Sequence, residues 1–282
     1  MKPLTLAYSP CPNDTFIFTP WVEGHIPGAP PVVQRLDDID VLNAAAMAGG
    51  PDVVKVSFHA YGHLRDRYCL LRSGGALGRG CGPLVVAREP MTAAAFSQKT
   101  VAIPGTLTTA ALLLRLFAPA LPAARMVVMR FDDIMPAVRG GRVDAGVIIH
   151  ESRFTYPRYG LVPVVDLGEW WEQTTGRAIP LGGIAMRRTL GDLLILETER
   201  ALAESVRFAH AHTGTIWPTI RRHAQEMDDD VMRRHIDLYV NAFTDDYGAE
   251  GEAAIRHLLG TAESLGIVPP SAQPLFIDNG WR

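Results

Sequence analysis

Predicted strands alternate with predicted helices through the first two-thirds of this chain, and the strands lead through polar turns into the helices. Residues 4–9 (LTLAYS) alternate apolar and small polar side chains, which is typical of a strand, and residues 14–24 (DTFIFTPWVEG) predict a helix. The order recurs where the β-branched run 52–57 precedes a helical pattern, and where the strand 99–105 precedes the helix 106–119. This alternation predicts an α/β fold with largely parallel sheets, followed by a mostly helical final third.

The length of 282 residues favours two domains over one. Two predicted strands, 82–88 (GPLVVAR) and 180–188 (PLGGIAMRR), bracket a middle block, and each ends in basic residues. An economical arrangement inserts the middle block into the first domain, with the two strands as paired crossovers and a ligand between the lobes. We therefore predict a lobe 1 made of residues 1–87 and 188–282, and an inserted lobe 2 of residues 88–187.

The charge and hydropathy patterns exclude two classes of partner. The net charge is -3 with neutral histidines, and no block of consecutive basic residues offers the electrostatic footprint that nucleic acid requires. The longest apolar stretches, such as 108–117, are too short to span a bilayer. Residues 1–14 meet a proline and a polar turn before any long apolar run, which does not resemble a secretory signal. We therefore expect a cytoplasmic protein with no nucleic-acid or membrane partner.

The cysteines and glycines do not form recognisable cofactor motifs. Cys11, Cys69 and Cys81 are odd in number and include no CxxC pair, which favours a reducing compartment and argues against a disulfide framework or a structural metal site. The glycine-rich segment 72–82 (RSGGALGRGCG) matches neither the dinucleotide-binding nor the P-loop pattern. We expect this segment to be a flexible connection between strands, and we expect no metal.

Ligands of open α/β sheets bind beyond the carboxyl ends of the strands, where loops lead into helix N-termini. The first such place is the turn 9–15 (SPCPNDT), in which prolines restrict the backbone. Asn13, Asp14 and Thr15 follow, and their side chains can cap a helix. The turn is therefore either a plain helix cap or a wall of the ligand cleft.

Three further strand ends carry polar groups. Ser57 could cap the helix that follows it, and the threonines of 105–109 (GTLTT) bring hydroxyls and amides together, although plain capping explains both. His150 terminates an apolar strand, where a structural role competes with proton transfer. Histidine suits proton transfer because its unperturbed pKa is about 6.5. Glu151 would face away from His150 on a regular strand, which makes it a poor orienting partner.

Four segments together resemble a known family. They are YSPCPNDTFIF (8–18), VVKVSFHAYG (53–62), IPGTLTTA (103–110) and DAGVIIHESRFTY (144–156), and they occur in the family's order and spacing. The chain resembles the 1,4-dihydroxy-6-naphthoate synthases of the futalosine branch of menaquinone biosynthesis. The resemblance implies a two-lobed fold like that of the type 2 periplasmic binding proteins, with the ligand cleft between the lobes.

The resemblance also implies an activity and its residues. The family cleaves a carboxylated small molecule, cyclic dehypoxanthine futalosine, to 1,4-dihydroxy-6-naphthoate and dihydroxyacetone without a cofactor. His150 matches the position of the family's proton acceptor. The substrate contacts that carry over are Lys55, Val56, Ser57, Thr108 and Thr109.

Two other functions remain open at this point. Chorismate dehydratase is a sibling enzyme of similar fold in the same pathway, although SPCPNDTF and IIHE favour the synthase. A solute-binding protein that captures a small carboxylate without catalysis is the alternative outside enzymes. Proteins of that class usually carry an export signal.

Overall fold

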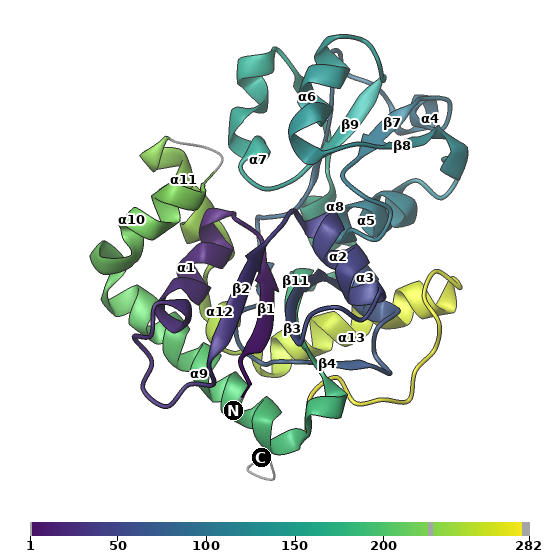
Figure 1. Ribbon diagram of the computed structural model, residues 1–282. Helices are drawn as coiled ribbons and strands as arrows, with labels where there is room; N and C mark the ends of the chain where they lie inside the picture. Colours follow the sequence, from purple (N-terminus) through teal and green to yellow (C-terminus); the bar gives the residue numbers. More distant parts are fainter. Residues whose placement is uncertain (1, 225–227, 278–282) are drawn as a thin grey trace. The chain divides into compact units, whose positions relative to one another are not determined.

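The computed structural model describes residues 2–224 and 228–277, and the chain folds into two compact units (Figure 1). Unit 1 comprises Met1–Gly78 and Pro180–Arg282, and unit 2 comprises Arg79–Ile179. Each unit has its own sheet and its own apolar core. Among the described residues, no helix combines the length and the hydrophobicity that crossing a bilayer requires.

A mixed sheet forms the centre of unit 1. Its strands are β1 (Leu4–Tyr8), β2 (Val32–Leu36), β3 (Val53–Ser57), β4 (Tyr68–Leu70), β5 (Ala76–Gly78) and β11 (Ile179–Arg187). They are ordered β2-β1-β3-β11-β4, and β5 pairs with β11 off this path. β1 is parallel to β2 and β3, whereas β11 runs antiparallel to β3 and β4. The carboxyl ends of β1 and β3 therefore lie at the same edge of the sheet.

Helices cover both faces of this sheet. α1 (Pro12–Val22) connects β1 to β2, and α2 (Ile39–Met47) connects β2 to β3 on the opposite face, as right-handed crossovers in opposite directions require (Figure 1). α1 packs against the long helix α9 (Asp192–Ala211). Leu6 of β1, Phe18 of α1 and Leu202 of α9 belong to one apolar core and expose none of their surface. The other helices of unit 1 are α3 (Phe58–Gly62), α10 (Thr213–His223), α11 (Asp229–Tyr239), α12 (Ala242–Asp245) and α13 (Gly248–Ser264), with a 3₁₀ turn at Arg188–Leu190.

Unit 2 is built around a second mixed sheet. Its strands are β6 (Leu84–Ala87), β7 (Val101–Ile103), β8 (Met126–Val128), β9 (Ala145–Ile148) and β10 (Val162–Asp166), in the order β10-β6-β9-β7-β8. β7 is parallel to both β8 and β9, and β6 is antiparallel to β9 and β10. Its helices are α4 (Ala93–Phe96), α5 (Thr109–Phe117), α6 (Phe131–Arg139), α7 (Ser152–Thr155) and α8 (Leu167–Thr175), with 3₁₀ turns at Ala123–Arg125 and Tyr156–Tyr159.

The strand pairing corrects the predicted domain boundaries after residues 87 and 187. β6, which we placed in lobe 1, pairs with β9 and β10 of unit 2. β11, which we placed in lobe 2, pairs with β3 of unit 1. The units instead divide after Gly78 and after Ile179. A sequence pattern shows that a strand exists, but only its hydrogen-bond partners show which sheet it joins.

The glycine-rich segment 72–82 contains strand β5, so it is more ordered than the flexible connection we expected. Its backbone packs closely, because a Cβ atom at Gly75 would lie 2.2 Å from the Tyr247 hydroxyl. Glycine is therefore needed here for close approach to a buried side chain.

The backbone of β9 lies close to α6, and we predict that adding a methyl group at this contact destabilises unit 2. A Cβ atom at Gly146 would lie 2.4 Å from Cγ2 of Ile134 and 2.9 Å from Cγ2 of Val138. We expect Gly146→Ala to lower the free energy of unfolding by about 1–3 kcal/mol, because this core must shift to admit the methyl group. Gly260→Ala is the control, since nothing lies within 4 Å of its Cβ position in α13. It should stabilise by about 0.5–1 kcal/mol. Equal urea midpoints for the two variants would contradict this packing.

Candidate active site

The turn after β1 begins α1 without a side-chain cap. Cys11 is the N-cap residue and Pro12 the first helical residue, a position that suits proline because its ring presets the backbone and no N–H is needed. The N–H groups of Asp14 and Thr15 donate to the Cys11 carbonyl at 3.1 and 3.0 Å. Asn13, Asp14 and Thr15 therefore lie inside the first turn, which corrects the expectation that their side chains cap it.

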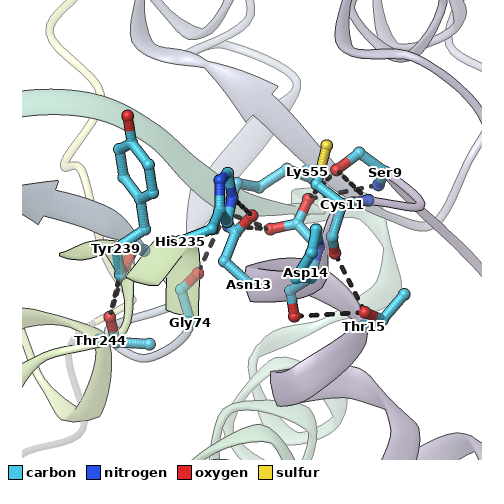
Figure 2. A network of polar contacts seen from close by, with 12 residues as sticks. Ser9, Cys11, Asn13, Asp14, Thr15, Lys55, Gly74, His235, Tyr239 and Thr244 are labelled. Carbon is cyan, nitrogen blue, oxygen red and sulfur yellow. Dashed lines mark hydrogen bonds and ion pairs between the residues drawn. The ribbon is translucent and has the colours of Figure 1, made fainter. Parts of the chain in front are cut away.

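Asp14 instead forms a buried ion pair with Lys55 of β3 (Figure 2). Lys55 Nζ lies 2.8 Å from Asp14 Oδ1, and the side chains are 6% and 2% exposed. The other carboxylate oxygen accepts from Ser9 Oγ at 2.7 Å and from Ser9 N at 3.2 Å. Buried charges require such pairing and hydrogen bonding, because transfer from water costs several kcal/mol per ion.

Asn13 connects this pair to the helical final third of the chain. Its Nδ2 donates to Asp14 Oδ1 at 2.9 Å, and its Oδ1 lies 2.8 Å from Nε2 of His235 in α11. His235 is buried, and its ring packs against that of Tyr239. Sequence reasoning missed His235. The available signal was its place on the buried face of an amphipathic helix, which also contains Tyr239.

The predicted substrate contacts of β3 lie in a fully buried strand. Lys55 and Ser57 point to one face of the sheet and Val56 to the other. Val56 exposes none of its surface. Ser57 is the N-cap residue of α3 but makes no side-chain cap bond, contrary to expectation. Its N–H donates to Asn43 Oδ1 at 2.9 Å, and its hydroxyl accepts from Asn43 Nδ2 at 3.0 Å.

In unit 2 the sheet brings the predicted threonines and His150 to one edge. β7 and β9 are parallel neighbours, so the residues that follow them share the carboxyl edge of the sheet. Thr108 is the N-cap residue of α5, where its hydroxyl accepts from Ala111 N at 3.2 Å and donates to Gly105 O at 2.8 Å. The expected cap is confirmed. The helix N-terminus offers N–H groups and a partial positive charge, both suited to an anion.

His150 has an unusual backbone conformation. It lies two residues beyond the end of β9 with φ of 56°, and it is the only non-glycine residue with positive φ among the described residues. Such conformations cost about 1–3 kcal/mol and cluster at functional sites. The imidazole lies half-buried, edge-on to Phe131 at 5.3 Å between ring centroids.

Glu151 is closer to His150 than strand geometry predicts. Both residues lie beyond the strand, so the alternation of side chains along a strand does not separate them. A ring nitrogen of His150 and a carboxylate oxygen of Glu151 lie within 4.8 Å of each other, and Glu151 is buried. Glu151 is therefore near enough to His150 to act as an orienting group, contrary to the expectation from strand geometry.

Two of the cysteines are unsuited to thiolate chemistry. Burial raises the pKa of the Cys69 thiol to about 11 and that of Cys81 to about 12. Both groups are therefore neutral thiols at neutral pH, and the thiolate is the form that attacks electrophiles or binds metals.

A separate groove of about 640 Å³ lies on unit 2 beside the edge strand β10. Tyr156, Trp170 and the Arg153–Asp166 ion pair line it. None of the predicted site residues is among the residues that line this groove.

Comparison with known proteins assigns the chain to a family. The family model described as menaquinone biosynthesis matches residues 4–264. The chain belongs to this menaquinone biosynthesis family. The 1,4-dihydroxy-6-naphthoate synthase of Thermus thermophilus is 50% identical over 277 residues, which cover 98% of this chain and 100% of the relative. The synthase of Streptomyces coelicolor is 50% identical over 269 residues, covering 94% and 95%. We conclude that this family member is an enzyme of menaquinone biosynthesis.

Solved structures confirm the expected fold class. A crystal structure of an Archaeoglobus fulgidus protein is 34% identical and matches with a TM-score of 0.88 over 94% of this chain and 98% of that one. The alkanesulfonate-binding protein SsuA of Xanthomonas axonopodis matches with a TM-score of 0.71 at 12% identity, over 96% and 95%. The second likeness shows the fold alone. The menaquinone-biosynthesis enzyme has the α/β fold of the periplasmic-binding-protein type.

We predict that removing the charge of Asp14 strongly destabilises unit 1. Asp14→Asn keeps the side-chain shape but leaves the Lys55 ammonium buried without its counter-charge, and loss of one partner of a buried pair costs about 3–5 kcal/mol. Asp132→Asn is the matched control, because Asp132 and Arg130 form an ion pair in which the side chains are 46% and 62% exposed, respectively. Exposed pairs contribute about 0–1 kcal/mol. Chemical unfolding should separate the two variants, and similar midpoints would refute the importance of the buried pair.

The backbone at His150 gives a second prediction. His150→Gly and His150→Ala both remove the imidazole, but alanine keeps the steric cost of positive φ. We expect the glycine variant to be more stable by about 1 kcal/mol. Thermal or urea unfolding measures the difference. A less stable glycine variant would show that this residue does not adopt the left-handed conformation.

Proposed function

We propose that this enzyme is a lyase that cleaves cyclic dehypoxanthine futalosine to 1,4-dihydroxy-6-naphthoate and dihydroxyacetone, with His150 as the proton acceptor. The observation that carries the proposal is the placement of His150. Its imidazole follows β9 in a strained conformation, at the sheet edge that also carries the N-terminus of α5. The 50% identity to two curated synthases over nearly the whole chain supports the same reaction.

The proposed chemistry needs a positioned base. Neutral His150 accepts a proton from a position beside an electron-withdrawing group, and the electron pair left behind forms a new double bond as the bond to the three-carbon fragment breaks. The fragment leaves with the electron pair of the broken bond and takes up a proton, which protonated His150 can return. The remaining ring becomes aromatic, which makes the cleavage favourable. One molecule is split into two without an oxidant or reductant, so the proposal requires no cofactor. General-base catalysis of this kind contributes about 10²–10⁴-fold.

We assign substrate contacts to Lys55, Val56, Ser57, Thr108 and Thr109. The N-terminus of α5 suits the naphthoate carboxylate, because the partial positive charge of the helix dipole at this end favours a negative charge. The Lys55 charge is already balanced by Asp14, which favours a neutral oxygen of the substrate as its partner.

We also assign the wall of the substrate site beside Lys55 to Asn13, Asp14 and Thr15. Asn13 and Asp14 are hydrogen-bonded to each other, and the Thr15 hydroxyl lies 3.1 Å from the Cys11 carbonyl. This arrangement supports a role in shaping the substrate site.

Turnover by purified protein tests the assignment of His150. We expect His150→Ala to lower kcat by about 10²–10⁴-fold, because it removes the proton acceptor, while substrate affinity changes little. His257→Ala is a control, since His257 is exposed on α13. Product formation followed by mass spectrometry gives kcat, and calorimetry gives the affinity. Unchanged turnover in His150→Ala would rule out the assigned role.

Product analysis with chorismate as a second substrate tests the two other functions, chorismate dehydratase and solute-binding protein. Loss of water from chorismate would indicate a dehydratase. Stabilisation by small carboxylates with no product from either substrate would indicate a binding protein.

A further inference from the structure

The ammonium group of Lys55 is held in place on two sides. Lys55 is one of three lysines in the chain, and it is the buried one that forms an ion pair with Asp14. Its Nζ lies 2.8 Å from Asp14 Oδ1 and 3.4 Å from the Gly74 carbonyl oxygen. Both partners connect to the segment that contains α11 and α12, far away in sequence (Figure 2).

The first connection runs through two side chains to His235. Asp14 Oδ1 accepts from both Lys55 Nζ and Asn13 Nδ2. Asn13 can donate there only if its amide nitrogen faces Asp14, and the opposite orientation would place two oxygens against each other. His235 Nε2 lies 2.8 Å from Asn13 Oδ1, so an Nε2–H group at this position fixes the orientation of the amide.

The second connection runs along the backbone. The Thr244 hydroxyl lies 3.0 Å from the Gly75 carbonyl oxygen and 3.2 Å from the Tyr239 carbonyl oxygen, and Gly74 N donates to Thr244 O at 2.8 Å. These bonds fix the loop that presents the Gly74 carbonyl to Lys55. The end of α11 is thus fixed close to where His235 contacts Asn13.

We propose that His235 is a positioning residue for Lys55, acting through Asn13 and Asp14. The inference rests on the proposed function, in which Lys55 contacts the substrate. Asn13 is buried, so an apolar residue at position 235 leaves its Oδ1 without this donor. The amide then turns to find another partner and withdraws its N–H from Asp14. The carboxylate loses one of the bonds that fix it, and Lys55 is held less firmly.

Lysine acetylation tests this chain of contacts without substrate. The folded protein is treated with a limiting amount of an acetylating ester, and Lys55 labelling is compared with that of exposed Lys2 by peptide mass spectrometry. We expect His235→Leu to raise relative Lys55 labelling at least about tenfold. His235→Gln, whose amide can still donate from a similar position, should stay near wild type. Unchanged labelling in His235→Leu would overturn the proposal.

Two further variants separate positioning from loss of stability. Ser205→Ala also loosens α1, because the Ser205 hydroxyl accepts from Trp21 N at 3.2 Å and donates to the Ile17 carbonyl at 2.6 Å. Lys55 labelling should not rise in this variant, and a rise equal to that of His235→Leu would overturn the proposal. If His235→Leu does not fold, Asn13→Ala breaks the same link and must raise Lys55 labelling.

Kinetics then distinguish failure of the inference from failure of the proposed function. With the cyclic futalosine derivative, we expect His235→Leu to raise KM about tenfold with kcat within about threefold, and His235→Gln to restore KM. Raised labelling with an unchanged KM would mean that His235 positions Lys55 but that Lys55 is not a substrate contact, which contradicts the contact assigned to Lys55 in the proposed function. A normal labelling ratio with a raised KM would overturn the positioning role of His235.

Discussion

A buried ammonium and a buried carboxylate, 2.8 Å apart, fix the carboxyl edge of the first sheet. Lys55 comes from β3 and Asp14 from the first turn of α1, so their attraction joins two elements that are not consecutive in sequence. Neither charge could remain buried alone, so both side chains must stay in the positions that pair them. Ser9 and Asn13 saturate the remaining carboxylate sites, and His235 extends the network to α11. A polar turn thus becomes a rigid part of the unit.

The second unit places its polar groups by topology. Parallel neighbours β7 and β9 end at one edge, so Thr108, Thr109 and His150 share it without being close in sequence. α5 begins with a true side-chain cap, whereas His150 adopts a conformation that the rest of the unit must stabilise. Conformational strain at a group proposed to move a proton is consistent with a site selected for chemistry more than for stability.

Local sequence patterns predicted much of the fold and of the candidate site, and non-local contacts account for the features that these patterns missed. The strand–turn–helix order gave the fold class and the positions of Thr108 and His150, because these depend on short-range periodicity. The pattern could not show that β6 joins unit 2, which depends on pairing with β9 and β10. His235 lies 222 residues from its partner Asn13, so no motif could connect them. The positive φ of His150 likewise depends on tertiary packing.

The pH dependence of kcat/KM, measured with the cyclic futalosine derivative in wild type and in His150→Ala, tests the central claim most directly. A general base must be unprotonated to accept a proton, so wild-type kcat/KM should fall at acidic pH as one imidazole becomes protonated. The residual activity of His150→Ala should lack this fall. The same acidic fall in both proteins would mean that another group is the base, and would contradict the role assigned to His150.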